Sequence, residues 1–487
     1  MAVFFKKSNH VLIQLESNND WDAFFDCCQG FLTEEDYNRL HIYLKEDAKT
    51  VVIEKEYYDA DYRNTYFNFF SHKFASYPHT TYRVNFFNKK IAPRMLFDLD
   101  RYQDDYIGFC VLRSNRVSSI GRSILNPKKL KEISGYICCA KYPVHILGAE
   151  LIAEGFPYMS QDTDVTICAH AACWMLFRYF SQRYNRYKET WPYEVTQLTD
   201  DVSYGRLVPS KGLTVGQITQ MFSKFGFYPE SYFREVPDYK PIFNTLLYQY
   251  VESGLPVVAG LPGHAITLIG HVSDFDATKK CCHSDEFLTG YIINDDNYMP
   301  YQVLGKGKNK HSDHWSKFSI ADIDSFVVPL YEKIHMSGEH VMKHVEAILS
   351  DSHLGIDACS KVLTNNEVVT RIFLTSSKSF KKVRRKDVLP FGISKVYAEL
   401  SMPKFIWVCE ISKRELFSRG KIVGELIFDA TASQFDRLAF MAIHYPDFLL
   451  LNDRSYLTDD PKRFSVRSVD IDSAVPYHCY INNLVEV

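Results

Sequence analysis

The sequence lacks a strong excess of charge of either sign. Its 487 residues include 56 Lys and Arg against 59 Asp and Glu, which gives a formal net charge of -3. A protein with this balance has no general electrostatic attraction for nucleic acid or for an anionic membrane surface. The composition therefore does not support a nucleic-acid partner.

Long apolar runs are also missing. No stretch approaches the ~18 uninterrupted apolar residues that a membrane-spanning helix requires. The most apolar run, 255–272, is interrupted by Pro262, His264 and His271. The start of the chain, MAVFFKKSNHVLIQL, contains no apolar segment followed by a small-residue cleavage site, as a secretory signal would. We therefore expect no membrane association and a cytoplasmic location.

The 12 cysteines show no regular disulfide framework. Adjacent pairs occur at 27–28, 138–139 and 281–282. In a chain without an export signal we interpret the cysteines as reduced thiols. The Cys-Cys-His motif at 281–283 is too compact to supply four zinc ligands by itself. We therefore expect no metal and no other cofactor.

The chain is too long for one hydrophobic core, so two or three domains are expected. We predict an α+β accessory region rich in Tyr and Phe at 1–145, a core at 146–335 and a C-terminal α+β region at 336–487. In the core, helical periodicity precedes strand patterns, which is typical of an α+β fold with a helical half and an antiparallel sheet. The aromatic stretch 57–77 has helical spacing and is interpreted as a packing face, because a base-stacking platform needs interleaved basic residues.

The stretch 161–179, QDTDVTICAHAACWMLFRY, is predicted to place Cys168 at the start of a buried helix. No Asp, Glu, Lys or Arg occurs from Cys168 to Phe177, which is typical of a helix in the middle of a fold. The unpaired first-turn N–H groups and the positive end of the helix dipole favour a thiolate at Cys168. Asp162 and Asp164 oppose this unless they turn outward to solvent. An inert buried thiol is the alternative.

A histidine and an Asp/Asn cluster follow in the order that nucleophilic thiol catalysis needs: a general base near the sulfur and a group that orients the base. His264 begins a predicted strand, and Asp295 belongs to the Asp/Asn cluster that ends the next one, in the segment 291–297, which is predicted as a strand running into a polar turn. His271 is an odd seven residues from His264, so in an unbroken strand it faces the opposite side. We therefore favour His264 as the base. The alternatives to Asp295 are Asn294, Asp296 and Asn297.

These segments resemble the papain-like cysteine peptidases, and are most similar to the bacteriocin-processing (double-glycine leader) peptidase-like branch. The resemblance covers about residues 161–300. It is carried by Gln161, by Cys168 to Ala172, and by the segments GLPVV at 254–258, GHAI at 263–266 and IIND at 292–295. It implies a papain-like core with Cys168 as nucleophile, His264 as general base and later acid, and Asp295 as the residue that orients the imidazole. It also implies that Gln161 and the backbone N–H of Cys168 bind the oxyanion.

The sequence departs from that branch in two places. Ala169 and His170 follow the cysteine, where glycine and then a small residue or proline are usual, and Gln161 precedes the cysteine by seven residues instead of six. Cys173, which is followed by Trp174, offers a second register for the nucleophile. It would lie more than one turn inside the helix, away from the positive end of the dipole.

The leading hypothesis is a thiol hydrolase that cleaves an amide or isopeptide bond in a protein or peptide substrate, through a thioester on Cys168. The same residues would serve deamidation or acyl transfer, because only the acceptor differs. The competing hypothesis is an inactive peptidase-like scaffold that binds or regulates another protein. The long terminal regions are consistent with a regulatory protein partner.

The C-terminal region is predicted to contain the strands 405–410 and 423–429. Their terminal carboxylates, Glu410 and Asp429, are interpreted as structural residues. The basic stretch 378–386 is interpreted as a solvated face or a mobile loop, because the chain has no overall positive charge to accompany it.

Overall fold

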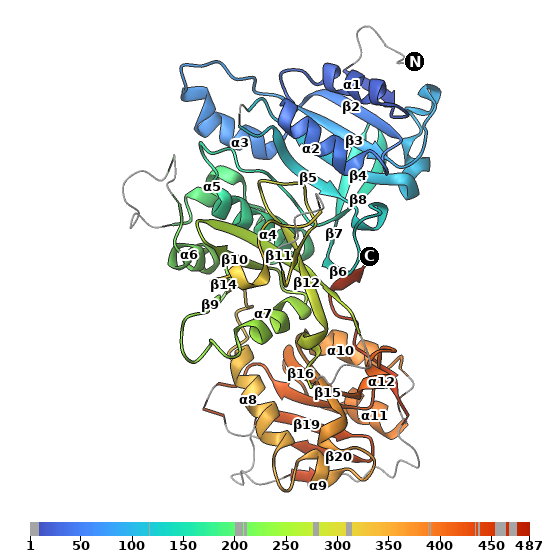
Figure 1. Ribbon diagram of the computed structural model, residues 1–487, viewed down its shortest axis with the longest axis vertical. Coiled ribbons are helices and arrows are strands. Elements are labelled where there is room, and N and C mark those ends of the chain that lie inside the picture. The colour runs from blue at the N-terminus through green and yellow to red at the C-terminus, as the bar shows by residue number, and fades with distance from the viewer. Residues whose placement is uncertain are drawn as a thin grey trace.

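Three antiparallel sheets follow one another from the N-terminal end of the molecule to the opposite end (Figure 1). The computed structural model describes residues 9–115, 117–199, 208, 212–275, 282–307, 314–387, 389, 391–433, 435–436, 439–452, 464–466 and 475–487. Helices accompany each sheet, so the predicted α+β class is confirmed. Within the described part of the chain, no helix combines the length and apolar composition needed to cross a bilayer.

The first sheet is a meander in which the strands pair in chain order, β1-β2-β3-β4-β5. Its strands are β1 (His10–Gln14), β2 (Thr50–Tyr57), β3 (Thr81–Phe87), β4 (Tyr106–Leu112) and β5 (Ile120–Leu125), and its helices are α1 (Asn18–Cys27), α2 (Glu34–Leu44) and α3 (Ala60–Asn68). Phe24 of α1 meets Phe86 of β3 edge to face, with ring centroids 6.2 Å apart. This packing buries one face of the helices against the sheet.

The aromatic stretch around α3 is only partly a packing face. Tyr62 and Phe70 are buried, as predicted, but Tyr58 and Phe67 are 58% and 53% exposed. The guanidinium of Arg63 lies 5.7 Å and 5.4 Å from these two exposed rings. Cation–π contact therefore takes the place of burial on the outer side of the helix.

The middle sheet positions the candidate site. Its strand order is β13-β12-β11-β10-β14-β9, and β6 pairs with both β11 and β23. The strands are β6 (Tyr136–Cys138), β9 (Glu230–Phe233), β10 (Val257–Leu261), β11 (His264–Ser273), β12 (Leu288–Asn294), β13 (Gln302–Gly305), β14 (Ser325–Val328) and β23 (Leu484–Glu486). The helices of this region are α4 (Cys168–Arg183), α5 (Pro192–Thr196), α6 (Val215–Phe225) and α7 (Phe243–Glu252), and a separate hairpin is formed by β7 (Ala140–Ile146) and β8 (Ala149–Gly155).

Local sequence signals define α6 and the hairpin that carries His264. Thr214 caps α6 by accepting a hydrogen bond from the backbone N–H of Gln217, and Gly226 ends the helix at φ 110°. Strands β10 and β11 are joined by a tight turn in which Gly263 has φ 71°, a conformation that favours glycine. The turn pairs Leu261 with His264, so the histidine begins β11.

Strand β11 contains an irregularity, although the prediction that His264 and His271 face opposite sides requires an unbroken strand. Its register with β12 shifts between Leu268 and Gly270. At Gly270 the neighbouring strand β6 passes so close that a Cβ atom would collide with the carbonyl oxygen of Tyr136. The simple alternation of faces between His264 and His271 therefore does not apply, and their roles are separated instead by their contacts.

The third sheet has the order β15-β16-β18-β19-β20-β21. Its strands are β15 (Val368–Ser376), β16 (Phe405–Lys413), β18 (Gly424–Asp429), β19 (Phe440–Tyr445), β20 (Phe448–Asn452) and β21 (Phe464–Val466), and β17 (Lys421–Ile422) pairs with β22 (Tyr477–His478). The helices are α8 (Gly338–Leu349), α9 (Ile356–Cys359), α10 (Ser377–Arg384), α11 (Phe391–Glu399) and α12 (Arg414–Phe417).

The basic stretch 378–386 is largely a solvated face, one of the two predicted alternatives, because Lys378, Lys382, Arg385 and Lys386 are exposed. Most of the stretch belongs to α10, and Arg384 is buried, where it binds Glu410 and Glu425. Glu410 lies opposite Glu425 in the sheet, whereas Asp429 lies opposite Ile406. Glu410 and Asp429 therefore do not form a carboxylate pair.

The sheet pairing crosses both predicted domain boundaries. Strand β6 lies before residue 145 and β23 lies near the end of the chain, yet the two pair with each other beside β11. Figure 1 accordingly shows the C-terminal end beside the middle region and not at the far end of the third sheet. The division at 145 and 335 stays a prediction.

Candidate active site

The register of two neighbouring strands brings His264 to the Asp/Asn cluster. Thr267 of β11 lies opposite Asn294, the last residue of β12. Because the strands are antiparallel, stepping back from Thr267 to His264 corresponds to stepping forward from Asn294 to the residues 295–297. The sequence separation between the histidine and the acidic cluster is thus closed by strand pairing.

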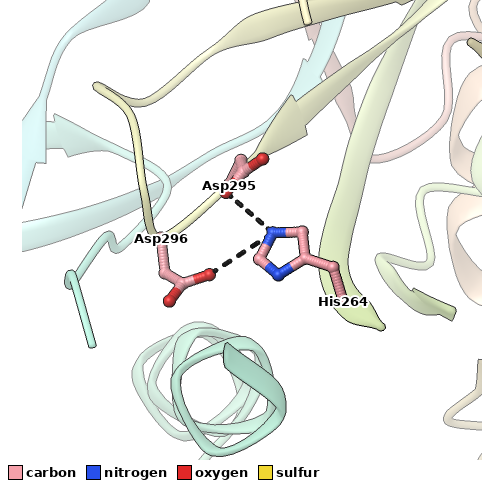
Figure 2. Close-up of side chains that lie close together, drawn as sticks. All are labelled: His264, Asp295 and Asp296. Atoms are coloured by element: carbon pink, nitrogen blue, oxygen red, sulfur yellow. Dashed lines mark hydrogen bonds and ion pairs between the residues drawn. The ribbon is translucent and has the colours of Figure 1, made fainter. Parts of the chain in front are cut away.

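The imidazole of His264 lies between this cluster and helix α4. Its Nε2 atom is 2.9 Å from an Asp295 carboxylate oxygen and 3.7 Å from one of Asp296. Figure 2 shows that the other ring nitrogen, Nδ1, points away from both carboxylates and toward a helix seen end-on, in the colour of α4. The hydroxyl of Thr267 is 3.5 Å from the carbonyl oxygen of Ala172, so β11 lies directly against the first turns of α4.

The surroundings of His264 favour its charged form. Burial by itself lowers the pKa of this imidazole, but hydrogen bonds to Asp295 and to the Cys168 side chain, together with the charges of Asp295 and Asp296, outweigh burial and raise the pKa to about 10. The ring is therefore an imidazolium at neutral pH. Since Nε2 faces the carboxylates, Nδ1 is the nitrogen left for the Cys168 sulfur.

Cys168 is the first residue of α4, as predicted, and its side chain is only half-buried. Its sulfur therefore lies at the positive end of the helix dipole and interacts with the His264 imidazole. The rival cysteine, Cys173, is fully buried, and burial raises the pKa of its thiol strongly. The structure thus places Cys168, not Cys173, beside His264.

Gln161 belongs to the same network. Its side-chain N–H donates to the Oδ1 atom of Asn297 at 2.9 Å, and the Asn297 amide nitrogen lies 3.4 Å from His264 Nε2. The backbone N–H of Asn297 donates to Asp295 at 3.0 Å. A glutamine amide carries two N–H donors, and one of them holds Gln161 in the site.

The loop between Gln161 and Cys168, which is one residue longer than in the peptidase branch that the sequence resembles, is held by backbone hydrogen bonds. One carboxylate oxygen of Asp162 accepts hydrogen bonds from the backbone N–H groups of Asp164, Val165 and Thr166, at 3.1, 2.7 and 2.8 Å. Asp162 is buried and does not turn outward to solvent. These N–H groups offset only part of the effect of burial, which raises the pKa of the Asp162 carboxyl, and Asp164 forms an ion pair with Lys73. Both carboxylates thus have local partners that the sequence did not indicate.

His271 takes no part in this arrangement. Its Nε2 atom lies 2.8 Å from a carboxylate oxygen of Glu252, and its Nδ1 atom lies 3.0 Å from the Ser273 hydroxyl. Both ring nitrogens of His271 are therefore engaged away from Cys168, and His264 is the histidine at the candidate site.

Phe318 is a site residue that sequence reasoning missed. Its ring stacks on the His264 imidazole, with centroids 6.0 Å apart and planes inclined by 25°. The ammonium of Lys317 lies 5.1 Å from the same ring. The stacking holds the imidazole plane in place beside its two hydrogen-bond partners. No spacing signal relates Phe318 to the triad, because it lies in an irregular segment after β13.

A second carboxylate, Asp296, makes the site sensitive to pH. Burial, followed by the negative charge of Asp295, raises the pKa of Asp296 to about 7 from an ordinary value of 3.8. A raised pKa in the folded state means that this group stabilises the fold below pH 4, and that the contribution is lost as the pH rises through 7.

We therefore expect Asp296→Asn to remove part of the pH dependence of stability. Between about pH 4 and pH 8 the wild type should lose on the order of 4 kcal/mol relative to the variant. Urea unfolding of both proteins at the two pH values measures this difference. An equal difference at both pH values would contradict the raised pKa.

His264, Asp295 and Asp296 also carry the types of side chain that bind a divalent cation. Within the described ranges, His264, Asp295 and Asp296 are the one group of three or more His, Cys, Asp or Glu side chains whose ligand atoms lie within 4.8 Å of one another. One imidazole and two carboxylates suit a divalent metal ion. In the motif at 281–283, Cys281 lies outside the described residues, Cys282 is exposed, and His283 Nδ1 is 2.7 Å from the Thr370 hydroxyl.

Comparison of the chain with protein-family models, with curated proteins and with solved structures finds no match in any of the three. The functional interpretation therefore rests on the geometry of these residues.

Proposed function

We propose that the protein is a thiol-dependent hydrolase with a papain-like arrangement, in which Cys168, His264 and Asp295 cleave an amide or isopeptide bond of a protein or peptide. The observation that carries the proposal is the position of the His264 imidazole. It is bound through Nε2 to a buried carboxylate, and it interacts with a cysteine at a helix N-terminus. This is the order of groups that thiol catalysis requires.

The arrangement supports a complete acyl-transfer cycle. The Cys168 thiolate attacks the carbonyl carbon, and the carbonyl π electrons move to oxygen, where the backbone N–H of Cys168 and the Gln161 amide would bind the oxyanion. When the tetrahedral intermediate collapses, the C–N bond breaks and the His264 Nδ1 proton passes to the leaving amine. Water then attacks the thioester, His264 accepts its proton, and the Cys168 thiolate leaves.

The raised pKa of His264 fits both halves of this cycle. In the resting enzyme the imidazolium already carries the proton that the leaving amine needs. Once the sulfur is acylated, the Cys168 interaction that helps to raise the pKa is lost, so the ring releases its proton more easily and can then act as a base. One residue thus serves as acid and then as base.

Selective alkylation tests the proposal. At neutral pH, iodoacetamide should modify Cys168 faster than the other cysteines, and His264→Ala should slow this modification by about tenfold, because a thiol without an ionic partner is only a few per cent thiolate. Mass spectrometry of peptides after timed labelling measures both rates. Cys282, which is exposed, is the internal reference, and its rate should not change.

Two outcomes of the same experiment would oppose the proposal. Uniform slow labelling of several cysteines would favour the inactive scaffold. A labelling rate at Cys168 that changes markedly when a metal chelator is added would favour a cation bound by His264, Asp295 and Asp296. We expect the chelator to have no effect, because a cation at Nε2 would compete with the hydrogen bond to Asp295.

Deamidation and acyl transfer use the same residues with a different substrate or acceptor. Hydrolysis is proposed first because it needs only water as the second reactant.

A further inference from the structure

A second site lies between the middle region and the C-terminal region. It is a cavity of about 450 Å³, which falls within the range of roughly 300–1,000 Å³ that is usual for small-molecule sites. One wall comes from the chain just after α4, at Tyr184 and Arg186, and the opposite wall comes from the end of β15 and the starts of α10 and β16. Since α4 has 16 residues, at about 1.5 Å per residue its ends are ~24 Å apart, so this cavity is separate from Cys168.

The rim of the cavity is strongly cationic. The described residues that line it include four cations and one carboxylate, namely Arg186, Lys333, Lys378, Lys404 and Glu332. The carboxylate is already engaged in an ion pair with Arg186. Among the described residues, none of the three lysines forms an ion pair with a carboxylate. Three like charges around one concavity raise its positive potential and favour an anion.

Backbone hydrogen bonding holds two of these lysines at the same edge. The N–H of Ser377 donates to the carbonyl oxygen of Lys404 at 3.1 Å, which ties the start of α10 to the segment that leads into β16. Lys378 is the next residue of α10. The basic stretch 378–386 therefore contributes one lysine to the cavity lining.

The interior of the cavity is aromatic and apolar. Tyr331 and Phe405 stack with centroids 4.9 Å apart and planes inclined by 8°, and Tyr184 meets Tyr331 edge to face at 5.8 Å. Leu255 and Leu374 also line the cavity. Tyr331 and the ammonium of Lys404, which is 5.3 Å from the ring centre, both lie against Phe405, so a flat ring would gain edge contact and burial against this wall.

We propose that this cavity binds a small organic phosphate with a flat ring, of the class of a nucleoside monophosphate or an aryl phosphate. The phosphate carries about -1.5 to -2 charge at neutral pH and three acceptor oxygens, which match a rim that carries several ammonium groups. The ring matches the aromatic wall. The site does not involve the triad, so the inference is independent of the proposed hydrolase activity.

Calorimetric titration of the full chain tests this inference with five probes: the four ribonucleoside 5′-monophosphates and phenyl phosphate. At least one probe should bind saturably, and the double variant Lys378→Ala/Lys404→Ala should bind it about tenfold more weakly. Both lysines are exposed, so the variant should fold. Lys382→Ala, on the same helix but outside the cavity lining, is the matched control and should bind normally.

Three results would overturn the inference. These are no binding of any probe, equal binding by the double variant, and equally tight binding of inorganic phosphate alone, which would leave the aromatic wall without a role. Cys168→Ala should retain binding. The ligand titration therefore tests this cavity alone, and the labelling of Cys168 tests the triad alone.

Discussion

Replacing His264 by alanine is expected to lower the turnover of 4-nitrophenyl acetate by about 10²–10⁴-fold, the usual contribution of a positioned acid–base group. This activated ester is attacked by an accessible thiolate, so it reports the chemistry without knowledge of the natural substrate. The variant loses both the charge that favours the Cys168 thiolate and the base that activates water for thioester hydrolysis. Release of 4-nitrophenolate, followed by absorbance, measures the burst and the steady state separately.

The two phases distinguish catalysis from simple thiol reactivity. Cys168→Ala should abolish both phases, whereas His264→Ala should leave a slow acylation and almost no turnover. His353→Ala is the matched control, because His353 is exposed and lies in the C-terminal region, and it should behave as the wild type. Wild-type turnover that survives in Cys168→Ala would refute the assignment of the nucleophile.

The candidate site was largely accessible from sequence because its residues stand at the ends of regular elements. Cys168 begins α4, His264 begins β11, and Asp295 follows β12. Such positions are marked by a change in hydrophobic period, and at His264 also by Pro262 and Gly263 in the adjoining turn. The caps of α6 were predictable for the same reason, since capping depends on neighbours in the chain.

Contacts between distant segments were not accessible in this way. The stacking of Phe318 on His264 and the burial of Asp296 beside Asp295 depend on how irregular loops close over the sheet. The pairing of β23 with β6 joins residues from the two ends of the chain. One sequence contains no periodic signal for such a pairing, because a short strand is specified by its partner more than by its own residues.

Arg384 is the one residue of the basic stretch whose burial the sequence did not indicate. In the sequence, Arg384 is one of five Lys or Arg residues within residues 381–386. In the structure it ends a short helix. In the fold its side chain is fully buried, with nitrogen atoms 2.7 Å from Glu410, 2.6 Å from Glu425 and 2.9 Å from Asp387. Three carboxylates from separate segments thus contact one guanidinium. Their negative charges offset the free-energy cost of burying the positive charge of Arg384.

Arg384→Ala should therefore destabilise the C-terminal region by about 3–5 kcal/mol, because removing one partner leaves buried carboxylates uncompensated. Glu410 keeps its second ion pair, with Arg371 at 2.7 Å, so the main loss falls on Glu425. Burial already raises the pKa of Glu425 to about 7, and uptake of a proton by this carboxyl in the variant should make the loss smaller in acid than at pH 8.

Urea unfolding followed by tryptophan fluorescence measures this loss, since Trp407 is buried in β16 close to the network. Arg385→Ala removes the same charge from the exposed neighbouring position and should change the free energy of unfolding by no more than about 0.5 kcal/mol. Equal losses in the two variants would mean that the buried network adds nothing beyond surface charge. A loss confined to Arg384→Ala and reduced in acid would show that one guanidinium compensates the buried carboxylates of the third sheet.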